Sequence, residues 1–389
     1  MIYVFLCLAV FTSQFSIASS SIGIGGLIIL TSFKLIYRSE KIFIEKNLLY
    51  FFGLFIIMQI VSSVFSSNPG ESFENISRKI SLYIIFFASI LFIKKEADLL
   101  MLLKILILFT ALVSAVEIIR FAVDYLPNPD KPLSEYRLQY YGYPVTNGEI
   151  KMILLLIIIP FLLVKKKFLF SKSILILLSL PLFITFYLTN TRNAILGLFT
   201  GLIITGSLKN RYFLAGLIVI VVLFLLFAPI AYKERVFSIA DPEHPSNKSR
   251  IVMWETGIKM FKDNPVWGVG DIDINKVYRM YKTPESHGEG SHMHNNFMQM
   301  LVNFGSLGLI SWLILMLYIF FRQVKIYSAS KQHELLNLIS LISVTSFTAL
   351  MITGLTEYNF GDAEFAAVFW FALSLAFLAE KFKLNGGKV

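Results

Sequence analysis

Stretches of roughly twenty apolar residues, bounded by charged residues, recur from one end of this 389-residue chain to the other. A helix needs about twenty such residues to cross the hydrocarbon core of a bilayer. Inside lipid, only helices and closed barrels satisfy their own backbone hydrogen bonds. Only 15% of the residues are charged, against about a quarter in soluble domains. The sequence therefore predicts an all-α, polytopic integral membrane protein.

The apolar runs predict about twelve transmembrane helices. Their expected ranges are 2–18, 22–37, 48–66, 80–93, 99–121, 147–164, 173–189, 194–208, 211–232, 294–321, 335–354 and 363–379. The first run is interpreted as a span and not as a signal peptide, because no Lys or Arg precedes it and no clear small-residue cleavage site follows it.

The Lys and Arg residues of the short loops predict the orientation. Seventeen lie in loops and the tail on one side of the expected helices, and five lie on the other side. Because short cytoplasmic loops hold the Lys/Arg excess, both termini are expected in the cytoplasm. The net charge of +10 is explained by this rule, so no nucleic-acid partner is predicted. The expected domains are spans one to nine at 1–232, an external loop subdomain at 233–293, and the last three spans with a cytoplasmic tail at 294–389.

The large external loop is expected to contain short amphipathic helices. The first would begin at Ser246 or Ser249 and run through Lys262, and the second would cover 273–282. Residues 267–271, Trp-Gly-Val-Gly-Asp, are expected to form a turn between them. The apolar face of the first helix is expected to consist of Ile251, Trp254, Ile258 and Phe261.

Two arginines are candidates for an anion site on the external side. Arg192 lies in the turn Thr189-Asn190-Thr191-Arg192-Asn193 between two apolar helices, and Asn193 is expected to cap the second of them. An arginine beside a helix N-terminus favours phosphate. Arg250 is expected in the first turn of the loop helix, against the dipole preference, and is therefore a poor candidate for a passive surface charge.

Histidines precede the tenth expected span in the segment Ser291-His292-Met293-His294-Asn295-Asn296. His292 and His294 are two residues apart and do not share a helix face, and neither an acidic residue nor a Cys at helical spacing completes a metal site. The lone Cys7 permits no intramolecular disulfide. Histidine with amide neighbours suits a general base, so His294 is the candidate; His287 and His292 are expected to be solvated.

Other charged residues have both structural and functional interpretations. Lys151 lies one turn inside its helix beside Glu149, and Arg120 is expected to pair with Glu117 or Asp124. In the last external turn, 354–362, Glu357 can orient a base or an arginine, although acidic residues in exposed turns are more often solvated. Ionisable groups at membrane depth are functional candidates by default.

These motifs, taken in their order along the chain, resemble those of the O-antigen ligase and polymerase superfamily of bacterial envelope glycosyltransferases. The resemblance rests on TNTRNAILG at 189–197, SRIVMWETGIKMFKDNPVWGVG at 249–270 and HMHNNFMQMLVNFGSLGLI at 292–310. Weaker matches are GYPVTNGEIKMILLL at 142–156 and GLTEYNFGD at 354–362.

The resemblance implies an inner-membrane glycosyltransferase that works on the periplasmic side. In the ligases of this family, a polysaccharide moves from a polyprenyl diphosphate to lipid A-core during lipopolysaccharide assembly. Carried over by motif, diphosphate binding falls on Arg192 and Arg250, and activation of the acceptor hydroxyl falls on His294. Asn295 and Gln299 follow as support, with Lys151, Arg137 and Glu357 as further candidates. No metal and no other cofactor is expected.

Two alternatives remain open. A polysaccharide polymerase would use the same donor and differ mainly in its acceptor; the compact twelve-span layout with one large loop favours a ligase modestly. A secondary transporter also suits twelve spans, but transporters generally bind near the bilayer midplane on broken helices. Here the strongest polar clusters lie at the expected external boundary.

Overall fold

The computed structural model describes residues 1–37, 44–127, 130, 132–133, 135–239, 241–282 and 292–386, and this part of the chain is all-helical. Arg38, Lys41, Lys131 and Lys388, which entered the orientation count, lie outside the described residues, as does His287. The predicted all-α class is therefore confirmed for the described ranges.

Helices occur at every expected span and in the large loop. They are α1 (Ile2–Phe11), η1 (Thr12–Gln14), α2 (Ile17–Tyr37), α3 (Lys46–Val64), α4 (Pro69–Phe92), α5 (Glu96–Asp124), α6 (Pro144–Leu162), α7 (Lys172–Leu188), α8 (Arg192–Lys209), α9 (Arg211–Phe227), α10 (Ile230–Phe237), α11 (Pro245–Asp263), α12 (Asn275–Tyr281), α13 (Asn296–Ala329), α14 (Glu334–Thr353) and α15 (Ala363–Gly386).

Eight of the described helices are long and apolar enough to cross a membrane: α2, α3, α4, α5, α6, α13, α14 and α15. Three further apolar helices are shorter, namely α1 with η1, α7 and α9, and α8 falls in neither group. The protein is thus a polytopic membrane protein, while the count of twelve spans and the sidedness stay predictions.

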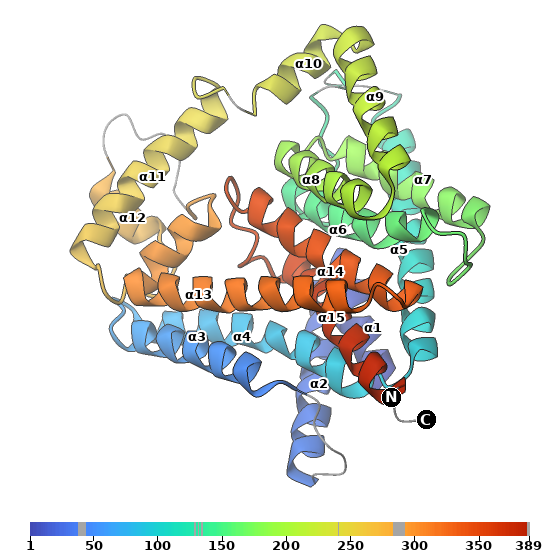
Figure 1. Cartoon of the computed structure of the whole chain (residues 1–389). Coiled ribbons are helices and arrows are strands. Elements are labelled where there is room, and N and C mark those ends of the chain that lie inside the picture. Colours follow the sequence, from blue (N-terminus) through green and yellow to red (C-terminus); the bar gives the residue numbers. More distant parts are fainter. Residues whose placement is uncertain are drawn as a thin grey trace.

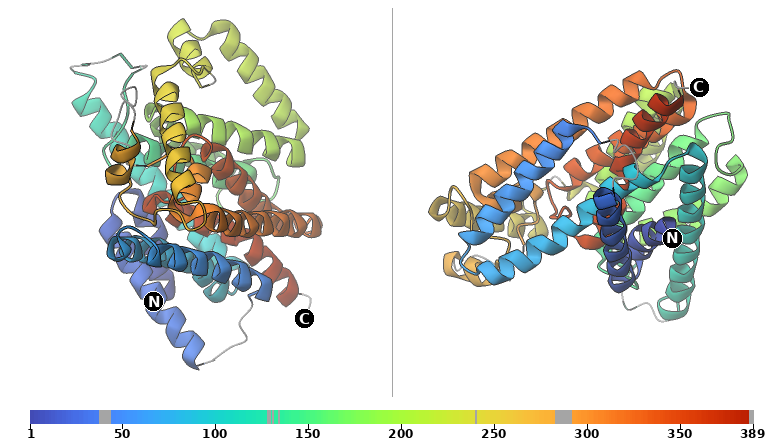
Figure 2. Two further views of the ribbon diagram at one scale, coloured as in Figure 1. Left: turned by 90° about the vertical axis from the view of Figure 1, so that its left-hand side faces the viewer. Right: turned by 90° about the horizontal axis from the view of Figure 1, so that it is seen from below.

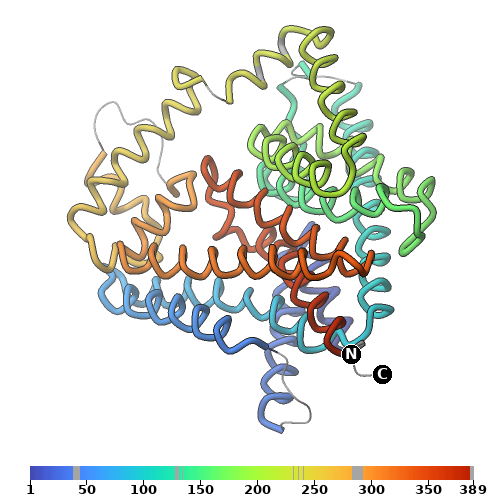
Figure 3. Tube along the Cα trace, viewed as in Figure 1, coloured from blue at the N-terminus to red at the C-terminus, as the bar shows by residue number. Residues whose placement is uncertain are grey.

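The arrangement separates a packed helical body from an arch. In Figure 1, α3 lies along α13 and α4 lies beside α3, while α6, α7 and α8 lie on the other side of α14. Helices α9, α10 and α11 form the arch that joins these two groups, as the tube in Figure 3 also shows. The left view of Figure 2 shows the arch above the body, with α2 projecting at the opposite side. The interior is formed mainly by α6, α14 and α15.

A break in α13 connects the large loop to the body. Gly305 has φ +67°, so the helix is not continuous there. The turn expected at 267–271 docks at this break: Val269 N donates to Val302 O (2.9 Å) and Gly270 N donates to Asn303 O (2.9 Å). A Cβ on Gly305 would lie 2.2 Å from Val266 O, so only glycine fits. The expected turn is confirmed, whereas the break in the tenth expected span was not predicted.

The face that the first loop helix buries differs from the expected one. Helix α11 buries a stripe one position away from the predicted stripe, formed by Met253, Thr256, Gly257 and Met260. Ile251 and Ile258 are exposed. The prediction failed because it counted aliphatic and aromatic residues, whereas Gly257 lets α11 approach Met293 and Val302 closely.

Candidate functional site

The histidine segment is held in an unusual backbone conformation directly before α13. His294 has φ +45°, in the left-handed region that non-glycine residues rarely occupy. Its neighbour Met293 is fixed on both sides, since Met293 N donates to Gln299 Oε1 (2.7 Å) and Trp254 Nε1 donates to Met293 O (2.8 Å). Backbone strain of this kind persists only where surrounding contacts enforce it, and it is concentrated at functional sites.

His294 contacts the carboxylate of Glu357. Nδ1 of His294 lies 2.8 Å from Oε1 of Glu357, and Nε2 of His292 lies 3.1 Å from the same oxygen. Tyr358 N also donates to Oε1 (3.1 Å). His292, with 35% of its side chain exposed, is both solvated and bound to Glu357. Glu357, with 7% exposure, is not a solvated turn residue. These contacts join the loop before α13 to the loop after α14.

Arg250 completes this cluster from α11. Nη2 of Arg250 lies 3.8 Å from Oε2 of Glu357, and Arg250 is mostly buried. It occupies the second turn of α11, not the first, because the helix begins at Pro245 and is capped by His244 and not by Ser246 or Ser249. The Nε atom of Arg250 is buried and has no hydrogen-bond partner among the described residues. We call His292, His294, Arg250 and Glu357 the histidine side of the site.

The charges of the histidine side stabilise each other. Burial alone raises the pKa of Glu357, but hydrogen bonds from His292 and His294 outweigh burial and hold that pKa well below its usual range. Burial lowers the pKa of Arg250, and the charge of Glu357 partly offsets this. An ionised Glu357 has only hydrogen-bond acceptors, so Nδ1–H of His294 donates to it, and in the neutral ring Nε2 is then the acceptor nitrogen.

The same residues form a group that can hold a metal ion. One ligand atom from each of His292, His294 and Glu357 lies within 4.8 Å of the other two. The expectation that no acidic residue completes the two histidines considered only helical spacing; Glu357 reaches them from a distant loop. However, Oε1 of Glu357 already accepts from three donors and Oε2 faces Arg250. Hydrogen bonding therefore accounts for the cluster without an ion.

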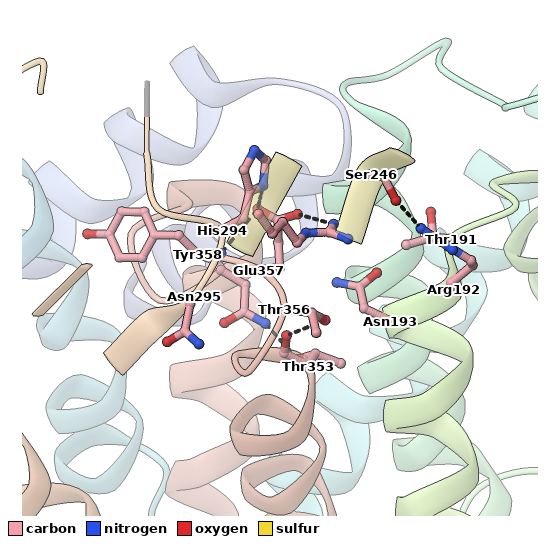
Figure 4. A network of polar contacts seen from close by, with 12 residues as sticks. Thr191, Arg192, Asn193, Ser246, His294, Asn295, Thr353, Thr356, Glu357 and Tyr358 are labelled. Carbon is pink, nitrogen blue, oxygen red and sulfur yellow. Dashed lines mark hydrogen bonds and ion pairs between the residues drawn. The ribbon is translucent and has the colours of Figure 1, made fainter. Parts of the chain in front are cut away.

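Arg192 begins α8 and contacts the arch. Its Nη1 donates to Ser238 O (3.0 Å) and Ser238 Oγ (2.6 Å), and its Nη2 donates to Ser246 Oγ. Ser238 ends α10 and Ser246 lies in the first turn of α11. We call Arg192, Asn193, Ser238 and Ser246 the arginine side of the site. Figure 4 shows Arg192 and Ser246 on the right, His294 and Glu357 on the left, and Asn193 directed between them.

Asn193 does not cap α8 as expected. Thr191 is the N-cap residue, without a side-chain cap bond, and Asn193 is the second residue of the helix. The side chain of Asn193 instead donates to Oε1 of Glu149 on α6 (2.6 Å). The prediction failed because Asn193 faces another helix, which a local capping rule does not consider.

The predicted support residues Asn295 and Gln299 make different contacts around the start of α13. Asn295 caps α13 by accepting from Met298 N (3.0 Å), and its Nδ2 donates to Leu355 O (2.8 Å). Gln299 donates to Asn303 Oδ1 (2.8 Å), and Asn303 donates to Asp271 Oδ1 (3.0 Å). Both residues therefore hold the histidine segment against its surroundings.

Asp271 ends this chain in an ion pair that sequence reasoning missed. Lys79 Nζ lies 2.7 Å from both carboxylate oxygens of Asp271 and 3.0 Å from Tyr358 Oη. Lys79 belongs to α4 and Tyr358 follows Glu357 in the chain, so three distant segments meet here. The sequence offered one signal, an acidic residue at the end of a Gly-Val-Gly turn, but no spacing rule links it to Lys79.

Three predicted basic residues lie elsewhere. Lys151 is buried in an ion pair with Glu117 (2.8 Å), so Glu117 is not the partner of Arg120. Arg120 lies over the rings of Tyr140 and Tyr141, 5.8 and 5.1 Å from their centroids. Arg137 is exposed between α5 and α6. None of the hydrogen bonds or ion pairs of His294, Glu357 and Arg250 among the described residues involves these three.

The helices and this cluster define a multi-pass membrane protein with a polar site at one end of its helices. A family model described as O-Antigen ligase matches residues 174–313, which confirms the resemblance on the segment that carries Arg192, Arg250 and His294. Members of this family are glycosyltransferase-like enzymes of ligase or polymerase type. Glu357 lies outside the matched segment. No curated protein matches the chain significantly.

Proposed function

We propose that the protein is an O-antigen ligase-like glycosyltransferase, which moves a polysaccharide from a polyprenyl diphosphate to lipid A-core on the periplasmic face of the bacterial inner membrane. The observation that carries the proposal is the His294–Glu357 pair beside Arg250, whose Nε is buried without a hydrogen-bond partner among the described residues, with Arg192 across the site (Figure 4). A buried donor without a partner indicates a missing acceptor, and a phosphate oxygen is the acceptor that arginine prefers.

The proposed reaction requires a base and a stabilised leaving group. The acceptor hydroxyl attacks the anomeric carbon and gives its proton to Nε2 of His294, while Glu357 stabilises the resulting imidazolium. The bond from the anomeric carbon to the diphosphate oxygen breaks, and its electron pair leaves with that oxygen. Arg192 and Arg250 stabilise the negative charge that develops there. Attack opposite the diphosphate inverts the anomeric centre.

The experiment uses purified full-length protein in detergent with a polyprenyl-diphosphate glycan and lipid A-core, with EDTA, and scores transfer on a gel. Wild type should transfer, and His294→Ala should lose transfer while still binding donor. The matched control is His333→Ala, because His333 is exposed at the start of α14 and should leave transfer unchanged. Normal transfer by folded His294→Ala would overturn the base assignment.

The acceptor and metal arms separate the remaining interpretations. Transfer to another lipid-linked glycan, but not to lipid A-core, would identify a polymerase. Loss of wild-type transfer in EDTA that Zn²⁺ restores would move His292, His294 and Glu357 to the role of metal ligands. The absence of transfer with every acceptor, together with gradient-dependent counterflow of a solute in proteoliposomes, would revive the transporter alternative.

A further inference from the structure

A buried acidic residue adjoins the site without taking part in the proposed reaction. Glu149 is in the second turn of α6 and has 1% exposure. A buried carboxyl group is costly unless hydrogen bonds satisfy it. Its position is fixed by close packing, since a Cβ on the adjacent Gly148 would lie 2.8 Å from Thr189 Oγ1 and 2.9 Å from Thr191 Cβ. Helix α6 thus packs directly against the turn that leads into α8.

One oxygen of Glu149 joins the two sides of the site. Oε1 accepts from Asn193 Nδ2 (2.6 Å) and from Asn359 Nδ2 (3.2 Å). Asn193 follows Arg192 on the arginine side. Asn359 is two residues after Glu357 on the histidine side. A single acceptor therefore connects α8 with the loop that carries the carboxylate partner of His294.

Asn359 extends the connection to the histidine segment. Its Oδ1 accepts from Asn296 Nδ2 (2.7 Å), and its Nδ2 also donates to Thr353 Oγ1 (2.6 Å). Asn296 Oδ1 accepts from Phe360 N (3.1 Å), and Asn296 N donates to Gly354 O (2.7 Å). The side chains of Asn359 and Asn296 each donate and accept hydrogen bonds, and a buried network connected in this way is rigid. His294 is two residues from Asn296, so the network reaches all three functional segments.

We infer that Glu149 is a positioning residue, whose Oε1 fixes the arginine-bearing start of α8 relative to the loop of Glu357 through Asn193 and Asn359. The expected effect of Glu149 on the transfer rate rests on the proposed function. Its expected effect on the arrangement of the site rests on the geometry alone. Because both hydrogen bonds use one oxygen, a glutamine can keep them, whereas an alanine removes them. The role is thus one of position and not of charge.

The kinetic experiment compares Glu149→Ala with Glu149→Gln in the transfer assay. Glu149→Ala should lower kcat about 100-fold, because misplacement of catalytic groups by about 1 Å costs that much, and Glu149→Gln should stay within about threefold of wild type. Glu149→Ala combined with Asn193→Ala should lose no more than Glu149→Ala alone, since residues of one network are not additive. A Glu149→Gln variant as inactive as Glu149→Ala would overturn the positional role.

The matched control breaks a similar buried contact away from the site. Gln323 of α13 has 0% exposure and donates to Ser343 Oγ of α14 (3.0 Å). Gln323→Ala removes this hydrogen bond and leaves a cavity, so it should lower thermal stability as Glu149→Ala does but leave kcat of the folded protein unchanged. Equal loss of kcat in both variants would reduce Glu149 to a general structural role.

A second measurement does not depend on activity. In a Cys7→Ser background, spin labels at Ile203 on α8 and Leu355 beside the Glu357 loop, both exposed, report the distance between the two sides. The distance distribution should be narrow in wild type and Glu149→Gln and broad in Glu149→Ala or in Asn359→Ala. Unchanged distributions would overturn the inference, whereas inactive wild type with the expected distributions would overturn only the proposed function.

Discussion

The histidine side and the arginine side of the site are stabilised by different contacts. On the histidine side, an ionised carboxylate holds two imidazoles and a guanidinium, and a chain of amides ties the segment to the Lys79–Asp271 pair. On the arginine side, Arg192 reaches across to a hydroxyl and carbonyl of the arch at Ser238 and to Ser246. The comparison indicates that the histidine segment is held both by the body of the protein and by α11, through Trp254 and Arg250, while Arg192 at the start of α8 contacts the arch at Ser238 and Ser246.

The largest effect on the transfer rate is expected on the histidine side, at His294. His294→Ala should lower kcat about 10²–10⁴-fold, the usual contribution of a general base, with little change in donor binding. The measurement is steady-state transfer together with donor binding in detergent. If weaker donor binding were the main defect of His294→Ala, His294 would belong to the donor site and would not act mainly as a base.

Removal of the ion pair behind the histidine side should mainly affect stability. Lys79→Met leaves Asp271, at 5% side-chain exposure, without its cation, and we expect a loss of about 3 kcal/mol in the free energy of unfolding. The control is its neighbour Arg78→Ala, because the Arg78–Glu74 pair is exposed and such pairs contribute about 0–1 kcal/mol. Thermal unfolding in detergent measures both variants. Equal shifts in Tm would contradict a larger contribution from the buried Lys79–Asp271 pair.

The two arginines should differ in which step they affect. Arg250→Ala should lower kcat about 10²-fold and also disturb Glu357, which it contacts. Arg192→Ala should weaken donor binding more than it lowers kcat, because the contacts of Arg192 shown here go to the arch and not to the base. The measurement is kcat and donor affinity of both variants, obtained by titrating each with donor. Equal changes in both quantities would contradict different roles for the two arginines.

Acid should destabilise the histidine side through Glu357. The pKa of Glu357 is lower in the folded protein than its ordinary value of 4.5, so its ionised form stabilises the fold above about pH 4.5, and this contribution is lost as the pH falls toward the folded pKa. Wild type should therefore exceed Glu357→Gln in Tm at about pH 5, and the difference should shrink as the pH falls below about 4.5. A difference that stays the same or grows between about pH 4.5 and 3 would contradict the lowered pKa.

The smallest effect on transfer is expected from Ser246 of the arch. Ser246→Ala removes one hydrogen bond of Arg192, which is worth about 1 kcal/mol, and should weaken donor binding severalfold with kcat unchanged. Ser249→Ala, three residues along α11, is the control. A loss of kcat in Ser246→Ala would show that the arch also affects the base.

Much of the fold could be predicted because membrane helices depend on local apolar length. The expected runs at 48–66 and 335–354 became α3 and α14 with small shifts. Side-chain partners could not be predicted in this way, since they depend on helix packing. Glu117 pairs with Lys151 from the next helix, and Glu357 meets His292 from a loop 65 positions earlier. Local rules placed Asn193 at a cap, whereas tertiary contact with Glu149 decides its side chain.

The break at Gly305 also has a consequence for biogenesis. The turn at 267–271 docks onto carbonyl groups of Val302 and Asn303, which are synthesised after it. Gly268 N and Asp271 N bond to Asn264 O and Ser72 Oγ, which are synthesised earlier, but Val269 N and Gly270 N lack these acceptors until α13 has formed. The turn therefore completes its docking only after the following helix has been made.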